Sequence, residues 1–512
     1  MALGIGYGLP FVAQHGANPY KTQWAAAREG AKGAGASVED ENAGAGSCLV
    51  SRGQEVYTDG LPFTPSLLIV PQFYKDGNLY QDVPPFVAED STMRFAVSRN
   101  TTATRVNSSG LIESVASGVP RIDWLGQSCP ALLVEASGQN LAFHSESWVS
   151  GNNWTLTDAT NVTGATSAPN GNATANALSP TAASGSHFVF SNGTTTVSYT
   201  SGTIYTQSAF FKAGTGAAGQ FVQLTFPSAR FTQTGYANFD LIAGTVSVVS
   251  GSSADANRAA RIESYGDGWY RCIFTATCNS TGTGAGLIIS LITSTGSGRL
   301  PSFTGVTGNV LYVWGAQLEA GSNATTYIPT TSGTGSRGAA EAISASGALV
   351  SGLIGQTAGT IYCEFAYFGQ PVTRSGPIYL RQGSLRGMGI NFAPTDSPSG
   401  IRFSSRNNAG TTNINIVSGA LQIGTFYKVA IAYDAAGTAA GGTQASGVVA
   451  YVNGVQTNIG TLQVPDAAGL TEFRMYGANS GDDNEAFNGR IRAAALYTTR
   501  LTDAQLAELT RL

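Results

Sequence analysis

Residues 448–455, Val-Val-Ala-Tyr-Val-Asn-Gly-Val, are the stretch that decides the fold. Val and Tyr favour extended backbone, and an Asn-Gly pair favours the two-residue turn that joins antiparallel strands, so the stretch predicts a β-hairpin. Working outward, residues 427–433 and 221–226 alternate apolar side chains with polar or small ones, as half-buried strands do. We therefore expect an all-β chain built from antiparallel sheets.

The composition agrees with several β-rich domains and not with disorder. The chain has 512 residues, which is enough for about three domains. Charged residues make up 11% and hydrophobic residues 42%, so the chain has the apolar side chains that a disordered chain lacks. The 65 glycines, together with many Ser, Thr and Asn residues, favour short strands joined by turns.

Charge and histidine content argue against nucleic-acid binding and histidine-based chemistry. The net charge is −4, from 27 basic and 31 acidic residues, and no basic stripe occurs that would attract a polyanion. The three histidines, His15, His144 and His187, lie far apart and have no metal-ligand spacing. We expect neither a nucleic-acid partner nor a histidine metal site.

The cysteines and the N-terminal residues indicate where the protein is made. The five cysteines are odd in number and include no Cys-x-x-Cys pair, so we interpret them as reduced core residues of a protein made in a reducing cytoplasm. They are Cys48, Cys129, Cys272, Cys278 and Cys363. The first residues lack the basic and apolar segments of a signal peptide, and no stretch is long enough to span a membrane, so we expect no membrane insertion.

Residues 93–144 carry the most specific motifs of the chain. In order, they are residues 103–107 (ATRVN), 110–112 (GLI), 120–123 (PRID), 132–135 (LLVE) and 140–141 (NL). Their order resembles a module common in phage tail and minor structural proteins. This chain departs from that module at Gly138-Gln139, where the family usually has Arg before the Asn-Leu pair. The resemblance implies a place in a virion and no particular reaction.

The region before this module differs from the rest of the chain. Residues 22–29 predict a short helix that ends at Gly30, and residues 74–80 predict a hairpin with Asp-Gly at its turn. We interpret residues 1–92 as a docking region that binds other virion proteins. An ordinary small domain is the alternative.

Residues 145–332 resemble a carbohydrate-binding-module-like jelly roll that is frequent in phage fibre proteins. The resemblance rests on residues 267–271 (DGWYR), 314–319 (WGAQLE) and 327–330 (YIPT). Trp269, Tyr270 and Trp314 are the candidate glycan-binding residues, because aromatic faces pack against the C–H faces of sugars. In the resembled fold the tryptophans usually lie in the core, and this interpretation is favoured over a glycan platform.

After a linker at residues 333–345, residues 346–512 resemble a laminin-G/concanavalin-like sandwich. The resemblance rests on residues 451–455 (YVNGV), 487–491 (FNGRI) and 496–506 (LYTTRLTDAQL), and it implies a last strand followed by a small helix. Residues 502–505 form a capping box that opens this helix. Leu506, Leu509 and Leu512 fall on one side of the helix, where a cap over the sandwich is favoured over a trimer seam.

An acidic loop in the same domain is the candidate metal site. It contains Asp482, Asp483, Asn484 and Glu485, and Ca²⁺ prefers such oxygen ligands. Laminin-G/concanavalin-like folds sometimes bind this ion. A solvated turn without a metal is favoured, so we expect no cofactor and keep Ca²⁺ as the alternative.

These features predict a non-enzymatic structural protein on the tail or capsid surface of a bacteriophage. We expect a tail-fibre adhesin that docks by its N-terminus and contacts host surface glycan, and the resemblance implies a homotrimer. A capsid-decorating fibre or a tail adaptor without a host ligand is the alternative. A polysaccharide-degrading tailspike is less favoured because no stacked repeat occurs. A glycosidase also needs two paired carboxylates, whereas Asp240, Asp267, Glu319 and Glu364 occur singly.

Overall fold

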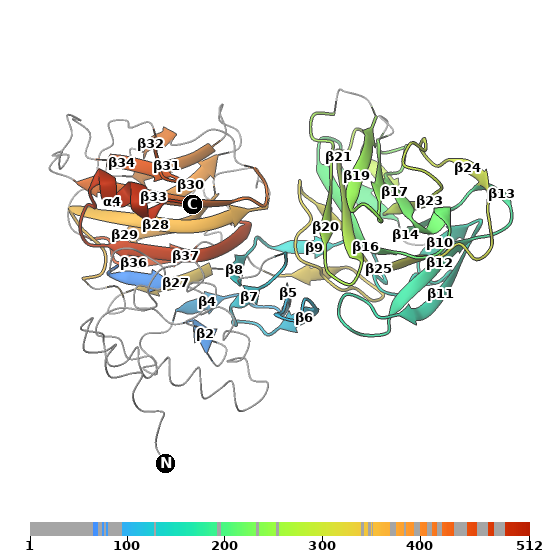
Figure 1. Cartoon of the computed structure of the whole chain (residues 1–512), viewed down its shortest axis with the longest axis horizontal. Helices are drawn as coiled ribbons and strands as arrows, with labels where there is room; N and C mark the ends of the chain where they lie inside the picture. Colours follow the sequence, from blue (N-terminus) through green and yellow to red (C-terminus); the bar gives the residue numbers. More distant parts are fainter. Residues whose placement is uncertain are drawn as a thin grey trace, which may run out of the picture. The chain divides into compact units, whose positions relative to one another are not determined.

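The computed structural model is an all-β protein in which the single α-helix of the described residues, α4, spans Asp503–Leu509 (Figure 1). The predicted all-β class with antiparallel β-sandwich domains is confirmed. The structure describes residues 65–69, 74–75, 78–79, 95–126, 130–191, 196–231, 235–251, 255–338, 342–346, 350, 352–368, 375–382, 386–393, 400–406, 412–416, 422–434, 448–457, 469–475 and 487–512.

The chain divides into two compact units, each made from separate stretches of sequence. We call one the split unit, which comprises residues 1–101, 115–136 and 339–512. We call the other the inserted unit, which comprises residues 102–114 and 137–338. The predicted module at 93–144 is therefore not a compact unit by itself, because its residues are shared between the two.

The split unit is a sandwich of two antiparallel sheets. The first sheet has the order β35-β34-β33-β28-β37-β8-β7, and the second has the order β32-β31-β30-β29-β36-β27-β4. Side chains of both sheets, such as Ile361, Ile431, Ile390 and Phe473, form one buried core. The strands are β4 Ala96–Ser98, β7 Arg121–Asp123, β8 Ala131–Val134, β27 Ala342–Ser346, β28 Ala358–Tyr367, β29 Ser375–Gln382, β30 Arg386–Ala393, β31 Gly400–Arg406, β32 Thr412–Ile416, β33 Phe426–Asp434, β34 Val448–Val452, β35 Val455–Thr457, β36 Glu472–Met475 and β37 Gly489–Tyr497.

The hairpin predicted at residues 448–455 is confirmed. Val452 of β34 pairs with Val455 of β35, which leaves a two-residue turn. Asn453 and Gly454 in this turn have φ angles of 51° and 81°, the left-handed values that a type I′ turn requires. Asn tolerates such a φ and Gly adopts it without steric cost, so the two residues fix the register of the hairpin.

Strands from the N-terminal side of the chain complete the first sheet. Strand β1, Leu67–Ile69, and strand β8 both pair with β37, the last strand of the chain. Leu67 and Ile69 are fully enclosed in the core of the split unit. Part of the predicted docking region is therefore a core strand, and residues 346–512 hold only part of this sandwich.

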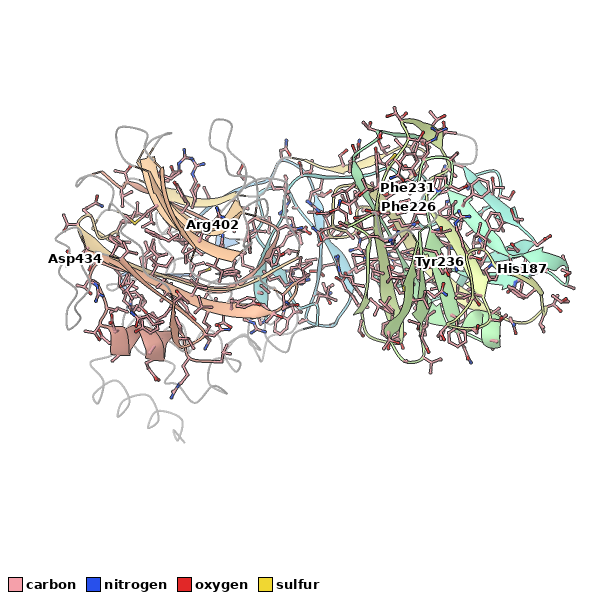
Figure 2. The ribbon with its side chains drawn as sticks, turned by 90° about the horizontal axis from the view of Figure 1, so that it is seen from above. His187, Phe226, Phe231, Tyr236, Arg402 and Asp434 are labelled. Carbon is pink, nitrogen blue, oxygen red and sulfur yellow. The ribbon has the colours of Figure 1, made fainter. Side chains whose placement is uncertain are left out.

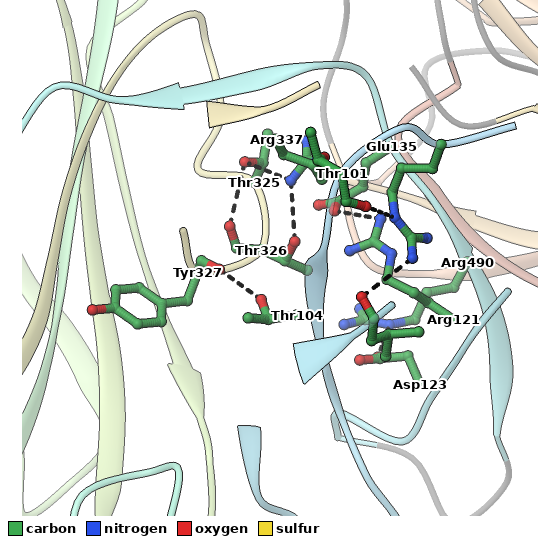
Figure 3. Close-up of polar contacts among 12 residues, drawn as sticks. Thr101, Thr104, Arg121, Asp123, Glu135, Thr325, Thr326, Tyr327, Arg337 and Arg490 are labelled. Carbon is green, nitrogen blue, oxygen red and sulfur yellow. Dashed lines mark hydrogen bonds and ion pairs between the residues drawn. The ribbon is translucent and has the colours of Figure 1, made fainter. Parts of the chain in front are cut away.

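Two buried ion pairs involve the PRID and LLVE motifs. Arg121 of β7 contacts Glu135 at 2.8 Å, and Asp123 of β7 contacts Arg490 of β37 at 2.5 Å (Figure 3). The four side chains are at most 6% exposed. A charge in such a place is tolerated only beside its partner, so these motif residues act in joining β7 and β8 to the rest of the sheet.

The terminal helix covers the outer side of the first sheet. Thr502 and Gln505 form the predicted capping box. Leu506 and Leu509 are buried in a cluster with side chains of β33, β34 and β37, whereas Leu512 is 80% exposed. The three leucines therefore do not share one face, and the structure agrees with a cap over the sandwich.

The inserted unit is also a sandwich of two antiparallel sheets. One has the order β10-β14-β23-β17-β18-β19, the other has the order β11-β12-β25-β16-β21-β20, and a single apolar core fills the space between them. The strands are β10 Trp154–Thr157, β11 Ala159–Thr166, β12 Ala175–Pro180, β14 Phe188–Ser191, β16 Ile204–Ala213, β17 Phe221–Thr225, β18 Tyr236–Asp240, β19 Thr245–Ser250, β20 Ala259–Ser264, β21 Trp269–Thr277, β23 Ile288–Ile292 and β25 Leu311–Ala320.

The two ends of the long segment of the inserted unit meet. Strand β9, Gly138–Asn140, pairs with β26, Gly335–Arg337, so residue 138 lies opposite residue 337. Adjacent ends are typical of a domain inserted into another domain. The ATRVN hairpin, β5 Ala103–Val106 with β6 Ile112–Val115, belongs mainly to the same unit.

The remaining local predictions have mixed outcomes. Cys272, Cys278 and Cys363 are free and buried, as expected of reduced core residues, whereas Cys48 and Cys129 lie outside the described residues. Strands β2, Tyr74–Lys75, and β3, Asn78–Leu79, pair as the hairpin predicted at 74–80 requires. The helix predicted at 22–29 lies outside the described residues. Within the part of the chain that the structure describes, no helix has the length and apolar character of a membrane span.

Replacing Arg490 by Met should lower the free energy of unfolding of the split unit by about 3–5 kcal/mol, because it leaves the Asp123 carboxylate buried without its partner. The double variant Asp123→Leu/Arg490→Met should recover most of this loss, since no charge remains buried. Urea unfolding of the full chain measures both effects.

Arg511→Met is the matched control, because the Arg511–Glu508 pair is exposed and should contribute at most about 1 kcal/mol. Equal losses for Arg490→Met and Arg511→Met would contradict the role given to the buried pair.

Candidate functional site

The motif residues of the inserted unit form a buried hydrogen-bonded network. Asn140 donates from Nδ2 to the carbonyl oxygens of Ala316 and Ile328, and its Oδ1 accepts from the backbone N–H groups of Ala142 and Leu318. The side chain is fully enclosed. One amide therefore joins three separate segments of backbone with all of its hydrogen-bonding capacity in use.

Ser145 and Glu146 meet the Tyr-Ile-Pro-Thr motif at Tyr327. The Tyr327 hydroxyl lies 2.7 Å from Ser145 Oγ and donates to Glu146 Oε1 at 3.1 Å. Burial raises the pKa of Tyr327 well above its ordinary value, and it also raises the pKa of Glu146. The Tyr327 ring packs against Trp314 with centroids 4.5 Å apart. These contacts hold the segment around Tyr327 against Ser145, Glu146 and strand β25.

Glu319, one of the four acidic residues weighed above, lies inside the same network. It accepts from Thr325 Oγ1 at 2.6 Å, from the Thr325 N–H at 2.9 Å and from Gln317 Nε2 at 2.7 Å. Burial raises the pKa of this carboxyl, and the hydrogen bonds from Thr325 and Gln317 oppose the shift. Arg337 donates to the hydroxyls of Thr325 and Thr326 (Figure 3). Glu319 thus holds the loop that contains Thr325 against β25.

A small pocket lies beside this network. It has a volume of about 90 Å³, and its lining residues include Thr102, Thr104, Ser114 and Ser336. Thr104 donates to the Tyr327 carbonyl at 2.6 Å (Figure 3). Pockets that enclose organic ligands usually measure about 300–1,000 Å³, so this one is too small to be the main ligand site.

The three predicted glycan-binding residues do not form an open platform. Trp269 is 2% exposed and donates from Nε1 to the Ser167 carbonyl, and Trp314 is fully buried and donates to Thr174 Oγ1. Tyr270 is half-buried and packs against the core. The hypothesis that both indoles stack on sugars is therefore corrected: their faces are enclosed by the protein, as the core interpretation expects.

The other acidic candidates are held by separate local contacts. Asp240 accepts from the N–H groups of Ile242 and Ala243 in a turn, Asp267 pairs with Lys212, and Glu364 pairs with Arg492. The predicted metal residues Asp482, Asp483, Asn484 and Glu485 lie outside the described residues. Among the residues that are described, no group of three or more metal-ligating side chains occurs.

The sequence analysis did not single out the outer side of the sheet β10-β14-β23-β17-β18-β19. Val189 of β14, Leu224 of β17 and Ile289 of β23 point into the core, so their neighbours along each strand point outward. Phe188 and Phe190 are such neighbours, and their rings stack with centroids 6.2 Å apart and planes at 27°. Both are half-buried. The Phe-Val-Phe alternation is the sequence signal that could have found this pair.

We call the outward side of this sheet the aromatic face. It comprises the half-buried Phe188 and Phe190 of β14 and Tyr236 of β18, together with Ile288 of β23, which is only 8% exposed. Strand pairing places Thr155 and Thr157 of β10 directly beside Phe190 and Phe188. Strand β17 lies between Tyr236 and Ile288, because its Thr225 pairs with both residues. The face thus combines flat apolar rings with hydroxyl groups that can donate or accept hydrogen bonds.

A strap at residues 293–303 crosses part of this sheet beside the aromatic face. Gln223 donates from Nε2 to the Gly298 carbonyl and accepts from the Leu300 N–H, both at 2.8 Å. Asn238 donates to the carbonyls of Thr295 and Ser297. These two buried amides fix the backbone of the strap to β17 and β18.

The far end of the strap is held by a buried histidine. His187, labelled in Figure 2, has its ring nitrogens 2.6 Å from the Asp158 carbonyl and 3.1 Å from the Phe303 carbonyl. Its ring also packs against Phe303, with centroids 4.4 Å apart. The strap is therefore attached at both ends. The His187 side chain acts in holding one of these ends in place.

The comparisons with known families agree with the fold of the split unit. Residues 362–507 match the family model described as the Concanavalin A-like lectin/glucanases superfamily. The match begins within β28 and ends within α4, so it lies wholly in the split unit. The laminin-G/concanavalin-like fold expected there is confirmed. A comparison with curated proteins found no match.

Similar solved structures include the CBM40 of Ruminococcus gnavus IT-sialidase bound to α2,3-sialyllactose, a SAP-like pentraxin from Limulus polyphemus, and domain 4 of the Geobacillus stearothermophilus arabinanase AbnA with arabinotriose. Their identities with this chain are 16%, 13% and 16%, and their TM-scores are 0.25, 0.23 and 0.26. The alignments cover 31%, 30% and 35% of this chain and 84%, 68% and 77% of those chains.

Replacing Asn140 by Ala should destabilise the inserted unit by at least about 2 kcal/mol, because it leaves buried backbone groups without hydrogen-bond partners. Thermal unfolding of the full chain measures the effect. The neighbouring variant Gln139→Ala is the control, since the Gln139 side chain is exposed and should change stability by less than about 0.5 kcal/mol. If both variants unfold like the wild type, the network does not hold the unit together.

Proposed function

We propose that this chain is a non-catalytic structural protein of a bacteriophage particle, a tail-fibre-type adhesin that attaches by its N-terminal region and contacts host surface glycan. The phage assignment rests on the motif resemblance of residues 93–144 and 145–332. The observation that carries glycan binding is the stacked, half-buried pair of Phe188 and Phe190 on the aromatic face.

The placement of the motif residues supports this division of roles. Asn140, Glu319 and Tyr327 are enclosed and use their polar atoms in internal hydrogen bonds. They stabilise the sandwich, and because they are enclosed, a ligand would contact other residues on the outer surface. A rigid sandwich with a variable surface is a common platform for binding.

The aromatic face has the chemistry that sugar binding needs. Sugar rings present C–H groups on one side, which pack against aromatic rings, and hydroxyls at their edges. Phe188 and Phe190 are two residues apart on one strand, so their rings lie on the same side of the sheet. Thr155 and Thr157 lie beside them and can bind sugar hydroxyls. The lectin-type fold matched by residues 362–507 agrees with a glycan-binding protein.

Leucine at both positions 188 and 190 should weaken binding to bacterial surface oligosaccharides on a glycan array about tenfold, because leucine keeps the apolar volume but lacks the flat ring. The control is Tyr312→Leu, which removes a half-buried ring from the other sheet of the same unit and should leave binding unchanged. Unchanged affinity in the double variant, with folding intact by thermal unfolding, would remove glycan binding from this face.

Cryo-electron microscopy of the intact particle tests the virion role. We expect the N-terminal region to pack on tail proteins, with three copies of the chain around one axis and the aromatic face accessible from outside. A chain that lies on the capsid surface, or an aromatic face covered by other particle proteins, would contradict the adhesin proposal.

A further inference from the structure

Arg299 in the strap is a fixed cation beside the aromatic face. Its Nε donates to Thr225 Oγ1 and its Nη2 donates to the Phe226 carbonyl, both at 2.9 Å. Both acceptors are neutral and belong to the end of β17 or the residue after it. The two bonds hold the guanidinium plane in one orientation.

No acidic side chain among the described residues forms an ion pair with Arg299. The Nη1 atom of Arg299 makes no hydrogen bond to any of these residues. Burial lowers the pKa of this guanidinium, because a half-buried charge loses part of its hydration. Two other arginines of the unit have acidic partners: Arg105 pairs with Glu113 at 2.6 Å, and Arg261 pairs with Glu263 at 2.9 Å. Arg230, like Arg299, donates only to neutral oxygens, but its acceptors lie in residues 280–283 and not on the aromatic face. The charge of Arg299 is therefore not compensated by any part of the chain that the structure describes.

Strand pairing places this cation close to the rings. Thr225, which accepts from Arg299, lies opposite Tyr236 on one side and opposite Ile288 on the other. Ile288 in turn lies opposite Phe190. Adjacent strands are about 5 Å apart, so the guanidinium and the Phe190 ring are within the span of one or two sugar residues.

We propose that the glycan bound by the aromatic face is anionic, and that Arg299 binds its carboxylate or phosphate group through Nη1. A guanidinium presents planar N–H donors that match both groups, and hydrogen bonds between charged partners are about twice as strong as neutral ones. The strap backbone is held by Gln223 and Asn238, so the cation is positioned before the ligand arrives. This inference rests on the glycan-binding function proposed above and specifies its ligand class.

The test is a glycan array that carries neutral bacterial oligosaccharides, uronic-acid oligosaccharides with their carboxyl-reduced counterparts, and polyglycerol phosphate. The full chain should bind anionic glycans and lose binding to the carboxyl-reduced forms. Arg299→Met should weaken this binding about tenfold or more, because a charge-assisted hydrogen bond is lost. Arg299→Lys keeps the charge and should retain the preference for anionic glycans at lower affinity.

Lys212→Met is the matched control, since it removes the same charge from another surface of the unit and should leave binding unchanged. Carboxylate and phosphate ligands are distinguished by which arm of the array is bound. Equal binding of neutral and anionic glycans, or anionic binding that survives Arg299→Met, would overturn this inference and leave the glycan function standing. If no glycan of any class binds, the proposed function fails and this inference fails with it.

Discussion

The architecture depends on the pairing of β37, at the end of the chain, with β1 and β8 from its beginning. The buried pair of Asp123 and Arg490 joins residues 367 positions apart in sequence, and neither charge is tolerable there without the other. The split unit is therefore complete only when both parts of the chain are present. The long segment of the inserted unit, residues 137–338, begins and ends at one place, where β9 pairs with β26.

Within the inserted unit, the residues that hold the fold differ from those proposed for recognition. The residues that carry the phage-type resemblance, such as Asn140, Glu319 and Tyr327, lie inside and spend their polar atoms on one another and on backbone. The aromatic face on the other sheet has no share in this network, so its side chains can differ without loss of the fold. A motif resemblance can thus indicate a particle class while the ligand is set by residues outside the motif.

The sequence predicted best what depends on near neighbours. The turn at Asn453-Gly454 and the capped helix after Thr502 follow from local backbone preferences and were predicted in place. The pairing of β1 and β8 with β37 joins distant parts of the sequence, and no local pattern reveals it. Trp269 and Trp314 are enclosed, as the favoured core interpretation of these large rings expects. Phe188 and Phe190 were not singled out, because the side of a strand that faces outward depends on the sheet it joins. Arg299 is recognised only from the structure, which places it beside the aromatic face without an acidic partner among the described residues.

The most direct test is an experimental structure of the full chain with a bound oligosaccharide that the array has identified. The account predicts sugar rings packed against Phe188 and Phe190, with an anionic group within hydrogen-bond distance of Arg299 Nη1. A sugar bound in the split unit or on end loops, with the aromatic face unoccupied, would contradict it.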